Sequence, residues 1–124
     1  MALSHDIPES RTGDFTMINK KYSTRDEVAA MKDIIADTVF DEEMVQLLEE
    51  EKKRESIEAQ IVKDADMIDQ FLECAEKSYD GMLLLKDWKG VMDKLYASLY
   101  TESARTLRKQ IESTNPRQRH EQFF

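Results

Sequence analysis

Residues able to bind a metal ion or move a proton gather near the start of the chain. His5, Asp6, Glu9 and Asp14 lie within ten positions of one another. Imidazole and carboxylate ligands suit Mg²⁺, Mn²⁺, Fe or Co better than they suit a thiolate-selective site. Successive side chains on a regular helix diverge by about 100°, so His5 and Asp6 can share one ion only where a helix ends. By itself the pair is weakly specific, because a helix end with capping carboxylates contains the same residues.

A second source of carboxylates lies in the segment Lys63-Asp64-Ala65-Asp66-Met67-Ile68-Asp69. A buried carboxylate without a partner costs several kcal/mol, so metal ligation, a salt bridge or exposure must satisfy each one. On a helical wheel Asp64 falls near the edge of the apolar stripe and Asp66 roughly opposite its centre. Periodicity alone therefore favours Asp64 as the buried group, and it leaves open which of the two has a chemical role.

The elements that must position these residues are expected to be helices. The 124 residues suit one domain and include only 3 Gly and 2 Pro, which favours long helices joined by short loops. Apolar spacing and capping residues predict about five helices. One begins after Ser23 or Thr24 and fades near Thr38, and the others cover approximately 41–55, 56–79, 83–100 and 101–115. The spacing leaves open whether the helix that begins near Asp41 continues through Arg54. Residues 15–22 are expected to be irregular, and Arg11 to Asp14 to form a turn in which Gly13 takes a positive φ.

The helix that begins at Ser56 is expected to be central. Its predicted core stripe consists of residues spaced by three or four, which places them on one helix face: Ile57, Ile61, Ala65, Ile68, Leu72 and Ala75. Four more apolar residues widen this stripe until much of the helix circumference is apolar: Val62, Met67, Phe71 and Cys74. The charged segment from Glu49 to Glu55 is expected to be solvated. In the next helices the predicted inward residues are Leu84, Trp88, Val91, Met92, Leu95, Leu99, Ala104, Leu107 and Ile111.

The charge of the chain narrows the classes of partner. A formal net charge of −8 disfavours a broad surface for nucleic acid, and Arg105, Arg108, Lys109, Arg117 and Arg119 make only a local basic strip. A small phosphorylated substrate remains compatible, since a bound metal ion reverses the local field. No apolar run approaches the roughly 20 residues that span a bilayer, and no signal peptide is visible. We expect a soluble cytoplasmic protein in which the single Cys74 is a small core residue.

Two motifs resemble those of a known family. The stretch from Ala2 to Asp14, which contains His5-Asp6-Ile7-Pro8-Glu9, is similar to the His-Asp stretch of HD-domain metal-dependent phosphohydrolases, and the 5'-deoxynucleotidase group is the most similar branch. The stretch from Ile61 to Asp69 resembles that group's later aspartate motif. The motifs occur in the expected order, and the resemblance covers nearly the whole chain.

This resemblance implies an all-α HD-domain-like bundle and a set of functional residues. His5, Asp6 and Asp66 would ligate a divalent metal ion such as Mn, Mg, Co or Fe. Glu9 would be the catalytic carboxylate that orients or deprotonates the attacking water, and Asp14 would assist it or lie near the substrate sugar. The implied reaction is hydrolysis of a phosphomonoester, with a deoxynucleoside monophosphate as the expected substrate.

The sequence departs from the family pattern at its start. The family has an earlier histidine ligand upstream of the His-Asp pair, whereas only four residues precede His5, and His120 in the tail matches no family position. Residues 1–116 are therefore expected to be an N-terminally incomplete HD-like domain, followed by a tail over 117–124. With three ligands left, activity should be impaired, and uncovered apolar faces should favour a homo-oligomer.

A second interpretation is a non-catalytic helical interaction module. The charged face from Glu49 to Arg54 and the aromatic residues Trp88, Tyr96 and Tyr100 fit a protein-binding surface as well as they fit an enzyme. Replacing Asp66 with Ala separates the two interpretations, because only the enzyme interpretation requires loss of metal binding.

Overall fold

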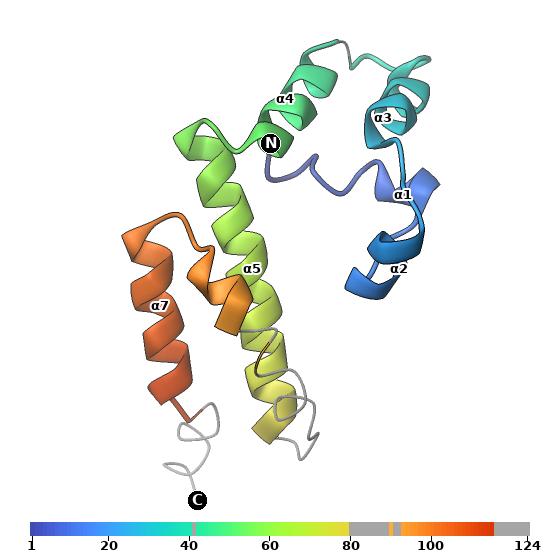
Figure 1. The fold of residues 1–124 in the computed structure, drawn as a ribbon. Helices are drawn as coiled ribbons and strands as arrows, with labels where there is room; N and C mark the ends of the chain where they lie inside the picture. The colour runs from blue at the N-terminus through green and yellow to red at the C-terminus, as the bar shows by residue number, and fades with distance from the viewer. Residues whose placement is uncertain (41, 80–89, 91–92, 116–124) are drawn as a thin grey trace, which may run out of the picture. The chain divides into compact units, whose positions relative to one another are not determined.

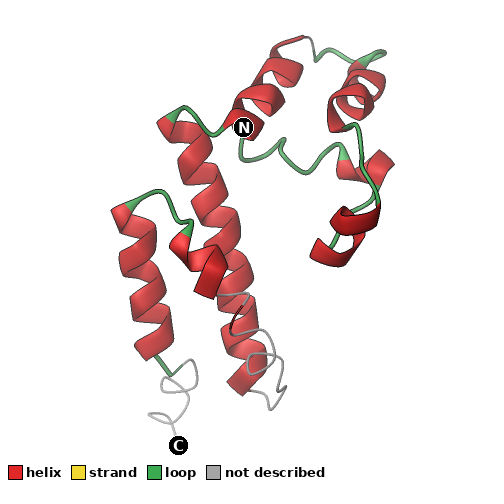
Figure 2. Cartoon of the chain, in the orientation of Figure 1, coloured by secondary structure: helices red, strands yellow, loops and turns green. Residues whose placement is uncertain are grey.

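A computed structural model describes residues 1–40, 42–79, 90 and 93–115. The expected all-α class is confirmed: these residues form helices joined by turns and contain no strand (Figures 1 and 2). Residues 93–97 are also helical. The bounded helices are α1 (Glu9–Thr12), α2 (Met17–Tyr22), α3 (Glu27–Ile35), α4 (Glu42–Lys53), α5 (Ile57–Tyr79) and α7 (Glu102–Ser113).

The start of the chain differs from the prediction at α2. Residues 15–22 were expected to be irregular, yet α2 forms there because Thr16 and Asn19 make a reciprocal capping box. The Asn19 amide donates to Thr16 Oγ1 at 3.3 Å, and the Thr16 amide donates to Asn19 Oδ1 at 3.2 Å. The positive φ expected at Gly13 is confirmed at 78°, but Arg11 and Thr12, which were expected in the same turn, belong to α1.

The boundaries of α3 are also corrected. Its N-cap is Asp26 rather than Ser23 or Thr24, because the Asp26 carboxylate accepts a hydrogen bond from the Ala29 amide at 2.9 Å. The helix ends at Ile35, and the Thr38 hydroxyl donates to the Ile35 carbonyl at 2.9 Å. Asp41, the expected cap of the next helix, lies outside the described residues.

The chain divides into two compact units, residues 1–62 and 63–124. In the first unit α3 packs against α1 and α4 around a buried apolar cluster of Met31, Ile35, Val45 and Leu48. Ile7 packs against this cluster, so the turn that carries His5 and Asp6 is anchored to the core. Glu51 is buried and ion-paired with Arg54, which corrects the expectation that the whole segment 49–55 is solvated.

In the second unit the core comprises Met67, Ile68, Phe71, Tyr96, Leu99 and Ala104. Phe71 and Tyr96 pack edge to face with ring centroids 4.7 Å apart, and the half-buried Cys74 packs against the cluster. Residues 80–89 and 91–92 lie outside the described residues, as do 116–124, so the predictions for Leu84, Trp88, Val91, Met92, His120 and the tail stay predictions. The helical residues before Leu99 end by 97, short of the predicted Tyr100.

The buried face of α5 agrees only in part with the predicted stripe. Ile68 is buried as predicted, and so are Met67 and Phe71 from the wider apolar face, whereas Ile57, Ile61, Ala65 and Leu72 are exposed. Asp64 is also buried on this face. The buried set keeps the spacing of three and four but is rotated around the helix, because α5 meets residues from the 93–104 region on that side. In α7 Ala104 is buried as expected, whereas Leu107 is exposed.

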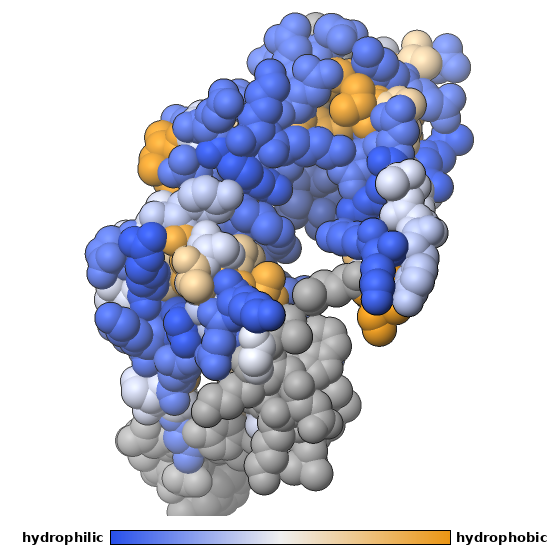
Figure 3. Space-filling view, viewed as in Figure 1, coloured by the Kyte–Doolittle hydropathy of each residue, from blue (hydrophilic) through white to orange (hydrophobic). Residues whose placement is uncertain are grey.

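Among the coloured residues of Figure 3, most of the surface is hydrophilic, and hydrophobic residues gather in small separate patches. Within the described residues, no helix has both the length and the apolar character needed to cross a membrane.

Candidate metal and catalytic site

His5 and Asp6 lie in a series of turns rather than in a helix. The His5 amide donates to the Met1 carbonyl at 3.1 Å, and the Glu9 amide donates to the Asp6 carbonyl at 3.0 Å just before α1 begins. In this turn the two side chains meet, and His5 Nε2 lies 3.3 Å from Asp6 Oδ1. The irregular backbone thus removes the divergence that a regular helix would impose on neighbouring side chains.

Both ring nitrogens of His5 have defined surroundings. Nδ1 lies 2.7 Å from the Ala2 carbonyl oxygen, and a carbonyl only accepts, so Nδ1 carries a proton. In the neutral ring, Nε2 then presents its lone pair towards the Asp6 carboxylate. Two electron-rich atoms in contact require a cation, either a proton on Nε2 or a metal ion between them.

The separation of these two atoms fits a shared metal ion. Ligand bonds of about 2.0–2.2 Å placed at right angles hold the two donor atoms about 3 Å apart, close to the observed 3.3 Å. The hydrogen bond from Nδ1 to a backbone carbonyl is also the usual device that orients a metal-binding histidine. His5 and Asp6 therefore suit the metal that their residue types predict.

Glu9 is the first residue of α1, and its carboxylate is held by a residue that the sequence did not single out. Arg25 Nη2 donates to Glu9 Oε1 at 2.7 Å, and Arg25 Nη1 donates to the Gly13 carbonyl at 2.7 Å. The guanidinium also lies over the Phe15 ring, 5.4 Å from its centroid. The Arg25 side chain thus contacts both the first residue of α1 and Gly13, the residue between α1 and Asp14.

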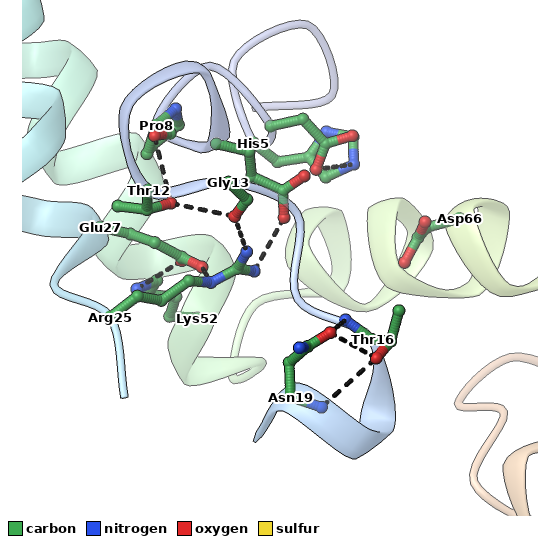
Figure 4. Close-up of polar contacts among 12 residues, drawn as sticks. His5, Pro8, Thr12, Gly13, Thr16, Asn19, Arg25, Glu27, Lys52 and Asp66 are labelled. Atoms are coloured by element: carbon green, nitrogen blue, oxygen red, sulfur yellow. Dashed lines mark hydrogen bonds and ion pairs between the residues drawn. The ribbon is translucent and has the colours of Figure 1, made fainter. Parts of the chain in front are cut away.

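Arg25 is itself held by a second acidic residue (Figure 4). Its Nε pairs with Glu27, and Lys52 from α4 pairs with the other Glu27 oxygen at 2.6 Å. Burial raises the pKa of Glu27, but the hydrogen bonds and positive charges of Lys52 and Arg25 outweigh it, so that pKa lies below its usual value. No local pattern marked Arg25 or Lys52, because the contact of Arg25 with Glu9 and that of Lys52 with Glu27 join residues far apart in the sequence.

The two candidate aspartates of α5 have different surroundings. Asp64 is 3% exposed and accepts hydrogen bonds from the amides of Tyr100 and Thr101 at 2.9 and 2.7 Å, and from the Thr101 hydroxyl at 2.7 Å. Its burial, which periodicity favoured, is confirmed, and its oxygens are used to hold the start of α7. Asp66 is exposed and pairs with Lys63 at 2.6 Å, which leaves its carboxylate accessible.

The predicted ligands are divided between the two units. His5, Asp6, Glu9 and the exposed Asp14 belong to the first, and Asp66 belongs to the second. Over the described residues of each unit, no three His, Cys, Asp or Glu side chains are gathered so as to hold a metal ion. The meeting of Asp66 with the His5–Asp6 pair stays a prediction.

Comparison with known proteins identifies the family. The model of the HD domain matches residues 1–112 and thus includes both predicted motifs. No curated protein and no solved structure matches the chain. HD domains generally bind divalent metal ions and are typical of metal-dependent phosphohydrolases. With nearly all of its described residues inside the matched region, the chain belongs to the HD domain family.

Proposed function

We propose that this chain is a metal-dependent phosphohydrolase that cleaves phosphomonoesters of nucleotides, in the manner of 5'-deoxynucleotidases. The observation that supports it most strongly is the contact between His5 Nε2 and Asp6 Oδ1 at 3.3 Å, with the opposite ring nitrogen fixed by the Ala2 carbonyl. This arrangement supplies two oriented donor atoms for one divalent ion.

In this proposal His5, Asp6 and Asp66 hold Mn, Mg, Co or Fe. The bound ion supplies positive charge that stabilises the phosphoryl oxygens and makes a nearby water more acidic. Asp66 suits the third position better than Asp64, because the Asp64 oxygens already accept three hydrogen bonds. Within these 124 residues the resemblance supplies these three ligands.

Glu9 acts on the water. Its Oε1 accepts a hydrogen bond from Arg25 at 2.7 Å, and in this proposal its other carboxylate oxygen, Oε2, takes the water's proton. The water oxygen then forms a bond to phosphorus while the bond from phosphorus to the ester oxygen breaks. The leaving alkoxide takes up a proton, and the products are an alcohol and inorganic phosphate. In this proposal the exposed Asp14 assists Glu9 or contacts the substrate sugar.

The test combines Mn²⁺ titration calorimetry with phosphate release from deoxynucleoside 5'-monophosphates. We expect His5→Ala and Asp66→Asn each to weaken Mn²⁺ binding at least about tenfold and to abolish metal-dependent phosphate release, since ligands and their orientation determine metal affinity. Asp69→Asn is the matched control, because Asp69 is an exposed carboxylate on the same helix.

Two results would contradict the proposal. Unchanged Mn²⁺ affinity in His5→Ala would remove His5 from the site, and the same result in Asp66→Asn would remove Asp66. Absence of metal-dependent phosphate release by the unmodified chain across nucleotide and other phosphomonoesters would reject hydrolase activity itself.

A further inference from the structure

We propose that Arg25 is a positioning residue that holds both catalytic carboxylates of this site in place. The inference rests on the proposed function, because it takes Glu9 and Asp14 as the catalytic pair. Its observations are the two 2.7 Å hydrogen bonds that Arg25 donates, one to Glu9 Oε1 and one to the Gly13 carbonyl. Figure 4 shows the guanidinium directed towards the Gly13 carbonyl from the segment that precedes α3.

The two bonds fix different parts of the site. The first bond restrains Glu9 directly and leaves one carboxylate oxygen for the water. The second bond restrains the peptide unit that joins Gly13 to Asp14, at a glycine with φ of 78°. Because glycine is the most permissive residue at such a backbone position, the turn has little rigidity of its own. By holding the Gly13 carbonyl, Arg25 therefore fixes the orientation of the backbone that leads into Asp14.

Arg25 is well suited to this role because it is itself immobilised. Its side chain is 15% exposed and pairs through Nε with Glu27, which is 13% exposed and bound by Lys52. A planar guanidinium with fixed donors loses little further freedom when it binds two acceptors. The chain of charges Lys52, Glu27, Arg25 and Glu9 connects α4 and α3 to α1.

The charges around Arg25 favour a positioning role for this residue over a role in binding the substrate phosphate. Two acidic groups, Glu9 and Glu27, face two basic groups, Arg25 and Lys52, so this network is neutral in sum. The guanidinium directs all three of its nitrogens at groups of the protein. Loss of Arg25 should therefore lower kcat, through misplaced carboxylates, and leave KM nearly unchanged.

The experiment measures kcat and KM for Mn²⁺-dependent phosphate release from deoxynucleoside 5'-monophosphates. We expect Arg25→Ala to lower kcat by roughly 10- to 100-fold, the scale of a small misplacement of reacting groups, and to change KM by less than about twofold. Arg25→Lys should recover part of the loss, because a lysine retains the charge but not the two-pronged geometry. Millimolar guanidinium should partly restore Arg25→Ala.

Arg11→Ala is the matched control. Arg11 lies in the same unit and pairs with Asp33 at 3.0 Å, but both side chains are mostly exposed, so its loss should leave kcat unchanged. A double-mutant cycle with Glu9→Gln adds a readout that a purely structural role would not alter. Because Arg25 acts in part through Glu9, the variant with both changes should lose less activity than the product of the two separate losses.

Each outcome decides the inference. It is overturned if Arg25→Ala behaves like Arg11→Ala, if KM rises while kcat holds, or if the losses from Glu9→Gln and Arg25→Ala multiply. Circular dichroism checks folding, and the same criteria apply to Arg25→Lys if Arg25→Ala does not fold. Absence of metal-dependent release by the unmodified chain and Arg11→Ala alike would instead reject the proposed function, and this inference with it.

Discussion

Asp64 and Asp66 are two positions apart on α5 and have opposite environments. Asp64 is buried and accepts three hydrogen bonds near the start of α7, whereas Asp66 is exposed beside Lys63. Glu27 and Glu9 are likewise held by cations rather than left in apolar surroundings. At the scale of single residues, donors far away in the sequence stabilise Asp64, Glu9 and Glu27, whereas the buried Glu51 pairs with Arg54 only three residues away.

Replacing Asp64 tests the first of these contacts. Asp64→Ala leaves the amides of Tyr100 and Thr101 without their acceptor, so we expect a loss of about 1–3 kcal/mol in the free energy of unfolding. Asp69→Ala, at an exposed position of the same helix, should cost less than about 0.5 kcal/mol. Urea denaturation followed by circular dichroism measures both. Equal effects would show that the Asp64 hydrogen bonds add nothing to stability.

The lowered pKa of Glu27 makes its contribution to stability depend on pH. A carboxyl group whose folded pKa lies below its unfolded value stabilises the protein above the unfolded value, and this stabilisation is lost as pH falls through the folded value. We therefore expect Glu27→Gln to reduce the free energy of unfolding at neutral pH, and the difference from the unmodified chain to shrink below about pH 4. Denaturation at a series of pH values tests this, with the exposed Glu58→Gln as control. A difference that grows in acid would contradict the prediction.

At the scale of elements, helix ends and helix faces are set differently. Local hydrogen bonds define the starts of α2, α3 and α7, where Thr16, Asp26 and Thr101 accept from the amides of Asn19, Ala29 and Ala104. The face that α5 buries depends instead on its neighbours in the 93–104 region. Its apolar residues extend far enough around the helix that two adjacent faces are plausible from spacing alone.

Phe71 and Leu72 provide a direct comparison of those two faces. Phe71 is 4% exposed and packs on Tyr96, so Phe71→Ala should cost about 3–5 kcal/mol of unfolding free energy. Leu72, in the predicted stripe, is 39% exposed, and Leu72→Ala should cost no more than about 1 kcal/mol. Thermal and urea denaturation distinguish the two faces. A larger loss of unfolding free energy for Leu72→Ala than for Phe71→Ala would indicate that the predicted face is the buried one.

At the scale of the whole molecule, the chain combines a net charge of −8 with exposed apolar side chains. In the first unit Val39, Phe40, Ile57 and Ile61 are each more than half exposed. Exposed apolar groups favour association between copies, while like net charge opposes it. We propose that association prevails and that the chain forms a homo-oligomer, as its sequence predicts.

Sedimentation velocity over a range of protein concentrations tests self-association. We expect the sedimentation coefficient to rise with concentration, and Ile57→Lys with Ile61→Lys to reduce that rise, since the change removes exposed apolar area. Asp66→Asn separates this property from catalysis: it should lose metal binding and still associate. A single monomeric species at every concentration would contradict the proposal.

Much of the local structure was determined by the sequence alone. Capping chemistry and helical spacing account for the all-α class, the positive φ of Gly13, the starts of α5 and α7 at Ser56 and Thr101, and the burial of Asp64. The sequence also indicated the HD family, because the residues of each motif are adjacent or nearly so. The local features above depend on interactions between residues that are close in the sequence, so sequence patterns predict them.

Only the tertiary structure decided which face of α5 is buried and what holds Glu9. The Arg25 contact joins positions 16 residues apart, and the contact of Asp64 with Thr101 joins positions 37 apart. No local spacing encodes such pairs, because their geometry arises when separate elements pack together. The contact between His5 and Asp6 depends on both the sequence and the fold. The two adjacent residue types indicated metal chemistry, and the folded turn brings the two side chains into contact.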